Sequence, residues 1–171
     1  LANATSATVT NTASPDDRAK GRFEFDVREL IRCGIDCLRD VARQLGNQAR
    51  DVVGIGITGQ QHGSVIVDTG LHPLTPFINW QDQRGNELSP DGITWVEAAN
   101  ARLTPDVARR TGCRLRTGFL STSLFWLRAN GRLPSIGRAC FLMDLFAATL
   151  TGGELLTDPS CAGSAGVFDV E

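Results

Sequence analysis

The sequence has no hydrophobic run long enough to cross a membrane and no excess of charge of either sign. Its 171 residues hold 17 Lys and Arg against 19 Asp and Glu, a formal net charge of −2 at pH 7. A membrane-spanning helix needs about 20 consecutive apolar residues. A nucleic-acid-binding domain is expected to carry a basic patch. We therefore expect neither a membrane protein nor a partner that is a nucleic acid.

The sequence also lacks the cysteine pattern of a disulfide-rich protein. Its five cysteines are odd in number and scattered along the chain. This spacing does not indicate a disulfide framework, and the N-terminal residues are too polar for a signal peptide, so we expect a cytoplasmic protein. Cys33 and Cys37 lie four residues apart on a predicted helix. A metal site would need two further ligands close by, and the neighbouring sequence supplies none. We expect no metal site.

The residues that are present indicate one α/β domain, since strand patterns alternate with helix patterns. Asp26 is a plausible cap for an amphipathic helix of about five turns that stops at Gly46. Thr104 begins another helix, and we expect Ser121 or Thr122 to cap a third. The predicted helices after the first cover residues 92–100, 104–110, 123–129 and 144–152.

The stretch 51–83 is predicted to hold three short strands separated by polar turns. In residues 52–57 the side chains of Val53, Ile55 and Ile57 point one way, while Gly54 and Gly56 fall on the other face. We expect this run to be a buried strand whose glycine face packs closely under another element. Further strands are predicted at residues 64–67, just before position 80, at 155–157 and at 165–170, with an edge strand within 1–10.

A dense polar cluster, Gln60, Gln61 and His62, lies between the first two predicted strands. Side chains that both donate and accept hydrogen bonds suit a ligand with many hydroxyl groups. The alternative is a polar turn in which His62 bonds to backbone. In the same stretch, Trp80 and Asp82 would form a wall of such a site. Their alternative role is structural, with an Asp82–Arg84 ion pair at a strand end and a core tryptophan.

Other polar groups favour structural roles over catalytic ones. Asp158 is a candidate catalytic carboxylate, but Asp before Pro is common turn chemistry. Four arginines near one predicted loop could bind an anion. The alternative is that they are solvated side chains around that loop: Arg109, Arg110, Arg114 and Arg116. The glycines at 54, 56 and 59 match the G-x-G-x-x-G pattern, yet a β-branched run follows where a dinucleotide site needs a helix. A P-loop motif is absent.

Several motifs together resemble the N-terminal domain of the FGGY family of carbohydrate kinases, over about residues 21–171. They are GIGITGQQHGS, then PFINWQDQR, the segment from TGF to FWL, and TGG leading to TDPSCAGSAGVFDV. Xylulokinases and sedoheptulokinases are the most similar branches. The resemblance implies a ribonuclease-H-like (actin-like ATPase) α/β domain with a mixed central sheet flanked by helices. Sugar and nucleotide would bind between this domain and a second one.

By this resemblance, the parent protein transfers the γ-phosphoryl group of ATP, with Mg²⁺, to a ketose such as xylulose or sedoheptulose. Gln61 and His62 would contact the small-molecule sugar, with Trp80 and Asp82 in the pocket wall and Phe119 on the opposite lip. The family's opening hairpin, its catalytic Asp and its nucleotide-binding domain have no counterpart in residues 1–171. We therefore expect no catalytic residue here, and an inactive isolated chain.

Two other functions and one assembly state are compatible with the sequence. A non-catalytic sugar-binding module is the main alternative, and a dinucleotide-dependent oxidoreductase is a distant third that would require a helix directly after Gly59. A homodimer is compatible with the resemblance. The chain opens on Leu1 and its only methionine is Met143, which favours a piece of a longer protein.

Overall fold

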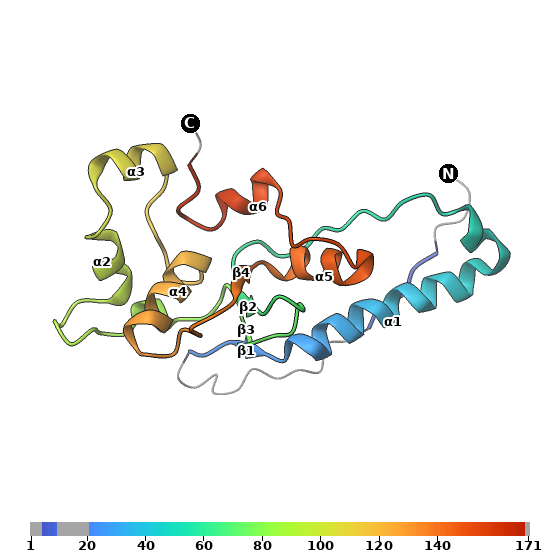
Figure 1. The fold of residues 1–171 in the computed structure, drawn as a ribbon, viewed down its shortest axis with the longest axis horizontal. Helices are drawn as coiled ribbons and strands as arrows, with labels where there is room; N and C mark the ends of the chain where they lie inside the picture. Colours follow the sequence, from blue (N-terminus) through green and yellow to red (C-terminus); the bar gives the residue numbers. More distant parts are fainter. Residues whose placement is uncertain (1–4, 10–20, 170–171) are drawn as a thin grey trace.

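The computed structural model describes residues 5–9 and 21–169 of the 171-residue chain. Its strands and helices, including the two 3-10 helices η2 and η3, follow one another in this order: β1 (Glu24–Phe25), α1 (Val27–Leu45), η2 (Gly46–Asp51), β2 (Val65–Val67), β3 (Phe77–Ile78), η3 (Arg84–Asn86), α2 (Trp95–Asn100), α3 (Pro105–Thr111), α4 (Leu120–Ala129), β4 (Arg138–Cys140), α5 (Leu142–Thr151) and α6 (Pro159–Gly163). The strands cross the centre of an elongated body, with α1 at one end and α2 to α4 at the other (Figure 1).

Helix α1 begins and ends where the sequence predicts. The Asp26 carboxylate accepts hydrogen bonds from two backbone N–H groups of the first turn, at 2.8 and 3.3 Å. Gly46 ends the helix with a positive φ of 55°, a conformation that suits glycine. Along the helix, a Cβ atom at Gly34 would lie 2.6 Å from the ring of Phe146. This glycine therefore lets α1 and α5 pack closely.

All strand pairings in the described residues are antiparallel. Strand β1 pairs with β3, and β2 pairs with β4. Two backbone hydrogen bonds of 2.9 Å between Ser64 and Ile78 join the two pairs, so the spatial order is β1-β3-β2-β4. The predicted mixed central sheet is therefore not found in the part of the chain that is described. Residues 52–57, which the sequence predicts to be a strand, pair with no described strand.

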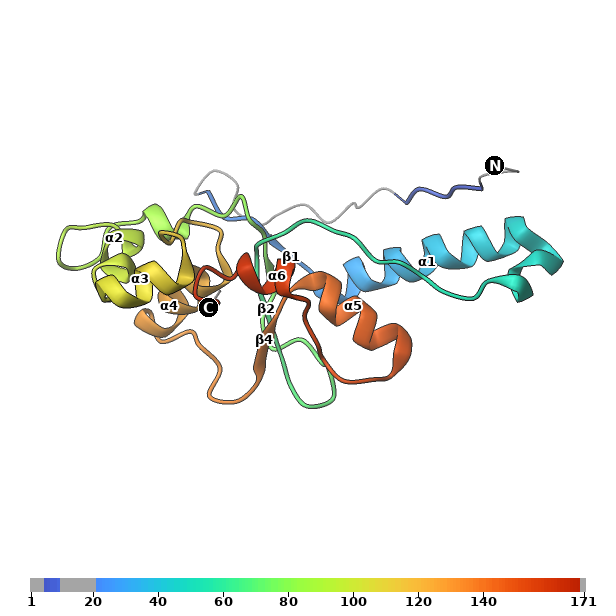
Figure 2. The same cartoon turned by 90° about the horizontal axis from the view of Figure 1, so that it is seen from above.

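Strand β2 lies at the centre of the hydrophobic core, because helices cover both of its faces. Val65 and Val67 are fully buried in a cluster that contains residues of α1 and α5. Ile66 points to the other face, into a cluster with Trp126 and Leu127 of α4. This division follows from the alternation of side chains along a strand. Figure 2 shows α4 and α5 on either side of this central strand.

The helices at 95–100 and 105–111 agree with the prediction, but the start of α4 does not. Thr94 and Thr104 cap α2 and α3 with their side chains. Helix α4 begins three residues before the predicted start, and no side chain caps it. The predicted caps, Ser121 and Thr122, lie inside the first turn of the helix instead of before it. Both of their hydroxyl oxygens are buried and have no hydrogen-bond partner among the described residues.

The predicted strands at 155–157 and 165–170 are wrong for the described residues, which end at 169. Neither 155–157 nor 165–169 contains a strand, and between them residues 159–163, predicted to be part of a loop, form the short helix α6. Asp158 caps it, and Pro159 occupies its first position, where proline is favoured because it needs no N–H donor there. The sequence signal was therefore a helix start, which we had interpreted as a turn.

The segment 52–57 is exposed and forms no strand, contrary to the prediction. Val53 is fully exposed and Ile55 is 59% exposed. Nothing lies within 4 Å of a Cβ atom built on Gly54 or Gly56, so the predicted close packing is also wrong. Residues 5–9 form no strand either, and the rest of the predicted edge strand and the loop at 11–20 lie outside the described residues.

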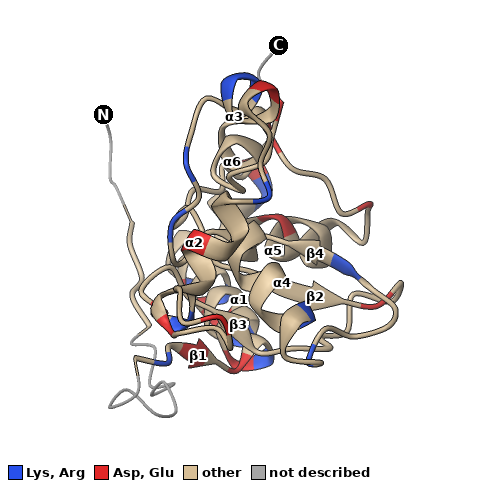
Figure 3. Cartoon of the chain, turned by 90° about the vertical axis from the view of Figure 1, so that its left-hand side faces the viewer, with Lys and Arg blue, Asp and Glu red and all other residues tan. Residues whose placement is uncertain are grey.

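Among the described helices, none combines the length and apolarity needed to cross a bilayer. All five cysteines are free thiols. In the cartoon of Figure 3, the positions of basic and acidic residues are interspersed along the elements. This distribution matches the nearly balanced composition.

Candidate functional site

The polar turn that precedes β2 is held firmly at its C-terminal end. His62 has a positive φ of 67°, which is uncommon outside glycine. The N–H of Gly63 donates a hydrogen bond of 2.9 Å to the carbonyl of Gly118. Gly63 itself has a φ of 78°, and a Cβ atom there would lie 2.7 Å from the carbonyl oxygen of Ile78. The turn is therefore fixed against two other segments, although Gln60 and Gln61 are exposed.

The His62 ring stacks on Phe119, with ring centroids 4.4 Å apart and planes inclined by 7°. Its Nδ1 lies 2.9 Å from the carbonyl oxygen of Ser164. A carbonyl oxygen only accepts, so Nδ1 carries the proton in this contact. In the neutral ring, Nε2 is then an acceptor, and no described residue hydrogen-bonds to it. The structure thus brings two predicted site residues together and leaves one of them with a free acceptor.

Gln60 is oriented by Asn79, a buried residue that directly follows β3. The side-chain N–H of Asn79 donates to Gln60 Oε1 at 2.9 Å, and Asn79 Oδ1 accepts from the backbone N–H of Gln81 at 2.9 Å. These two bonds fix which end of each amide donates. Gln60 therefore has its NH₂ group left to donate. The sequence indicated a polar cluster but gave no signal for this orientation.

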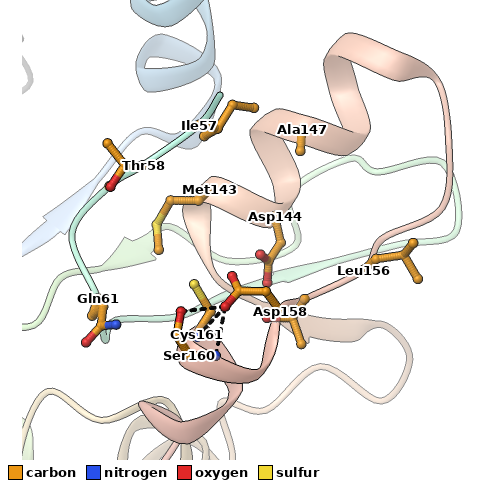
Figure 4. Close-up of a pocket in the computed structure, with 12 residues that line it drawn as sticks. Ile57, Thr58, Gln61, Met143, Asp144, Ala147, Leu156, Asp158, Ser160 and Cys161 are labelled. Carbon is orange, nitrogen blue, oxygen red and sulfur yellow. Dashed lines mark hydrogen bonds between the residues drawn. The ribbon is translucent and has the colours of Figure 1, made fainter. Parts of the chain in front are cut away.

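A cavity of about 430 Å³ lies beside the turn, between residues 57–61 and helices α5 and α6 (Figure 4). Gln61 is the predicted site residue that reaches it. The other lining residues come from the turn, from α5 and from the segment that leads into α6: Ile57, Thr58, Gly59, Met143, Asp144, Ala147, Leu156, Thr157, Asp158, Ser160 and Cys161. The cavity is of a size that suits a small ligand.

Two carboxylates line this cavity, in different environments. Asp158 accepts hydrogen bonds from the hydroxyl and N–H of Ser160 and from the N–H of Cys161, and these bonds hold the pKa of Asp158 below its usual range. Burial raises the pKa of Asp144, and the charge of Asp158 raises it further, against a hydrogen bond from Thr157. Asp158 thus has a structural role as the N-terminal cap of α6, where the sequence had indicated a turn.

Trp80 and Asp82 are placed differently from one another. Trp80 is 43% exposed, so it is not a core residue. A Cβ atom on Gly118 would lie 2.0 Å from the Trp80 carbonyl oxygen, so this glycine lets the Phe119 segment pack directly against Trp80. Asp82 is completely buried and bonds to Arg84 at 2.7 and 3.0 Å. The ion pair that the sequence offered as the structural alternative is present, and Asp82 has no exposed surface with which to contact a sugar.

The remaining candidate sites find no support in the geometry. Arg109 pairs with Asp106 and Arg110 with Asp169, so these arginines are engaged in exposed ion pairs. No group of three or more His, Cys, Asp or Glu residues in the described part of the chain is arranged to hold a metal ion. No helix begins after Gly59, since the turn leads into β2. The feature that a dinucleotide site would require is therefore absent from this turn.

Comparison with known proteins identifies the family. The sequence model of the N-terminal domain of the FGGY family of carbohydrate kinases matches residues 3–171. The chain belongs to this family. A glycerol kinase from Methylobacterium nodulans is 32% identical over 161 residues, which cover 89% of this chain and 31% of that protein. A xylulose kinase from Haemophilus influenzae is 31% identical over 121 residues, 70% of this chain and 23% of its own length.

Solved structures show the same fold for this FGGY domain. The crystal structure of a xylulose kinase from Rhodospirillum rubrum superposes with a TM-score of 0.78 at 21% identity, over 92% of this chain and 32% of that one. A Plasmodium falciparum glycerol kinase solved with ADP gives a TM-score of 0.74, also at 21% identity, over 92% of this chain and 32% of its own. The chain thus spans about a third or less of the length of these relatives.

Proposed function

We propose that this FGGY domain is the sugar-binding part of an ATP-dependent carbohydrate kinase whose substrate is a ketose such as xylulose or sedoheptulose. The family match supports a carbohydrate kinase, and the relatives include both glycerol kinases and xylulose kinases. The choice of a ketose rests on the GQQHG and WQDQR motifs in this sequence. The full-length protein would transfer a phosphoryl group from ATP to a sugar hydroxyl.

The observation that carries the proposal is the polar turn at residues 60–62, which is largely exposed and whose His62 ring stacks on Phe119. Gln61 lines the cavity, while His62 stacks on Phe119 and keeps Nε2 as an acceptor. Amide groups and a neutral imidazole can both donate to and accept from sugar hydroxyls. Trp80, nearly half exposed, offers an apolar plane for the carbon face of a sugar. We propose that the sugar is contacted by Gln61, His62, Trp80 and Phe119. Asp82 has a structural role in its ion pair with Arg84.

The described residues do not by themselves fit ATP and Mg²⁺. Catalysis of phosphoryl transfer needs carboxylates that hold the metal and backbone groups that hold the phosphates. Asp82 is fully engaged with Arg84, and Asp158 caps α6. No described cluster of metal-ligating side chains is present. We therefore assign no step of the transfer to these residues, and we expect the isolated chain to bind sugar weakly without turning it over.

A thermal-shift panel tests the binding proposal on the purified 171-residue protein. We expect D-xylulose or sedoheptulose at millimolar concentration to raise the melting temperature, and sucrose to leave it unchanged. His62→Ala should abolish the shift and leave the unliganded protein folded, because the variant loses one hydrogen bond, worth about 0.5–1.5 kcal/mol, and the stack on Phe119. A wild-type protein that no ketose or polyol stabilises would contradict sugar binding by this domain.

The alternative, a non-catalytic sugar-binding module, is separated from the kinase by turnover of the full-length protein. With Mg-ATP and the sugar selected in the panel, a kinase should release ADP at about 1–100 per second. A binding module would show the thermal shift and no sugar-dependent ADP release.

A further inference from the structure

The segment 158–166 contacts both partners of the His62–Phe119 stack. It forms helix α6 and the turn after it, and Ser164 and Gly166 of that turn are buried. The Ser164 carbonyl is the acceptor for His62 Nδ1, at 2.9 Å. A Cβ atom on Gly166 would lie 2.6 Å from the Phe119 ring, so the backbone of Gly166 lies directly against that ring. One short segment therefore sets the position of both rings.

The turn at the end of this segment is itself held at several points. The N–H and the hydroxyl of Ser164 both donate to the carbonyl of Cys161, at 2.9 and 2.7 Å. The carbonyl of Ala165 accepts from the N–H of Ser121 at 3.2 Å, in the first turn of α4. The direction of the Ser164 carbonyl therefore depends on α6 being formed and docked.

Helix α6 is short, so its formation depends strongly on its N-terminal cap. Five residues give only about one and a half turns, which are marginal without outside support. Asp158 supplies that support through three hydrogen bonds, to the hydroxyl and N–H of Ser160 and to the N–H of Cys161. Figure 4 shows these bonds beside the cavity, at the N-terminal end of α6.

We propose that residues 158–166 are a positioning element that locks the imidazole of His62 in its Nδ1–H form, with Asp158 acting on the candidate site through α6. The consequence is chemical selectivity. With Nδ1 committed to Ser164, Nε2 accepts a hydrogen bond and so favours a hydroxyl that donates. A free ring could turn over or exchange tautomers and would present a donor as readily as an acceptor. The inference rests on the proposed function for its ligand, but not for the state of the ring.

Nuclear magnetic resonance tests the proposal directly in the 171-residue protein. The chain has two histidines, and His72→Gln assigns the signals of each. At about pH 8.5, where ordinary imidazoles are neutral, the ¹⁵N shifts and couplings of a ring show which nitrogen carries the proton. We expect His62 to be a single Nδ1–H tautomer in the wild type. A ring protonated mainly at Nε2 overturns the proposal without any variant.

Matched variants test the role of the cap. Asp158→Ala should turn the single His62 tautomer into a mixture, and Asp158→Asn should preserve it, because Asn also caps helices well. Thr104→Ala removes the side-chain cap of α3 and should leave His62 unchanged. If Asp158→Ala leaves the tautomer unchanged, or if Asp158→Asn behaves like Asp158→Ala, the cap does not act on His62 and the proposal fails.

A second variant addresses the other end of the segment and keeps the test independent of how Asp158→Ala folds. Gly166→Ala places a methyl group against Phe119 at a φ of 86°, so it should displace the turn and mix the His62 tautomers. An unchanged tautomer in the folded variant counts against the proposal. Titration with D-xylulose then separates the two hypotheses: a locked Nδ1–H ring that no sugar perturbs supports the positioning element and refutes the sugar site.

Discussion

Two apolar runs, separated by seven residues, have similar sequences and opposite environments. Residues 65–67 form β2, with exposures of 0%, 5% and 0%. In residues 52–57, the four large apolar side chains Val52, Val53, Ile55 and Ile57 are 51%, 102%, 59% and 38% exposed. Both runs are rich in β-branched residues, which favour strands. The difference lies in their neighbours: β2 pairs with β4 along its whole length, and the first run pairs with no described strand.

The comparison shows that a strand is formed by its partners and not by its own propensity. A strand gains stability from cross-strand pairs and from burial of its side chains. Strand β2 has both, and it brings the polar turn that precedes it into contact with Gly118 and Ile78. The part of the candidate site that is hydrogen-bonded to other segments is therefore the part next to β2. The predictions that follow compare substitutions on the paired side with matched ones on the unpaired side.

The largest effect is expected from Asp82→Asn, which breaks the buried ion pair behind β3. Removing one partner of a buried pair leaves the charge on Arg84 poorly compensated and should cost about 3–5 kcal/mol of unfolding free energy. Asp106→Asn, which breaks the exposed pair with Arg109, should cost less than about 1 kcal/mol. Urea denaturation measures both. Equal losses of unfolding free energy in the two variants would show that the buried Asp82–Arg84 pair does not stabilise the fold more than an exposed pair does.

The Asp82–Arg84 pair should also affect how the free energy of unfolding changes at acidic pH. Burial alone would raise the pKa of Asp82, but the hydrogen bonds and charge of Arg84 outweigh it and lower the pKa. A carboxylate with a lowered pKa contributes stability above its unfolded pKa of about 3.9, and that contribution is lost as the pH falls through the lower folded value. In Asp82→Asn, the decrease in stability below about pH 4 should therefore be shallower than in the wild type.

A second prediction uses one substitution in both runs. Ile66→Ala removes a side chain buried against Trp126 and should cost about 2–5 kcal/mol. Ile55→Ala removes the same atoms from a side chain that is 59% exposed, so the change should stay within about 0.5 kcal/mol. A cost of more than 1 kcal/mol for Ile55→Ala would mean that residues 52–57 are buried in solution.

Glycines give a smaller contrast between the same two regions. Gly63→Ala should cost roughly 1–3 kcal/mol, because its methyl group would approach the Ile78 carbonyl at a φ of 78°. Gly56→Ala has open space and should change the stability by less than about 0.5 kcal/mol. Thermal unfolding of the two variants checks this, and a larger loss for Gly56→Ala would restore the close packing that the sequence suggested.

The smallest effect is expected from Asp144→Asn, in the wall of the cavity. Burial raises the pKa of Asp144, so the native state binds a proton more tightly than the unfolded chain does. Its contribution to stability is complete below the unfolded pKa of about 3.9 and is lost as the pH rises through the folded value. Asp144→Asn should therefore gain on the wild type between pH 3.5 and pH 7, by roughly 1 kcal/mol or less. A relative loss over that range would contradict the sign.

Local signals predicted much of the fold, and long-range ones did not. The Asp26 cap, the Gly46 stop and the Thr104 start are set by neighbouring residues and could be read directly. The exposure of residues 52–57 depends on which other segments pair with them, and no local pattern contains that information. The helix at 159–163 was missed because Asp before Pro begins both turns and helices.

The candidate site divides in the same way. His62 and Phe119 are 57 residues apart, and only the family resemblance placed them at one site before their stacking was seen. The burial of Asp82 could not be read from WQDQR, because the same spacing suits a ligand contact and an ion pair. Gln60 belonged to the predicted polar cluster, but its orientation by Asn79 was not predicted, and the cavity residue Thr58 was not a candidate site residue. Their roles depend on side-chain directions that a sequence does not encode locally.

The measurement that tests the central claim most directly is chemical-shift mapping of a ketose on the ¹⁵N-labelled 171-residue protein. We predict that D-xylulose perturbs the side-chain amide of Gln61, the ring nitrogens of His62 and the indole N–H of Trp80, and that His62→Ala removes these changes. Glucose at the same concentration should produce no comparable set. Perturbations confined to residues far from the polar turn, or none at saturating sugar, would contradict the assignment of this turn to the sugar.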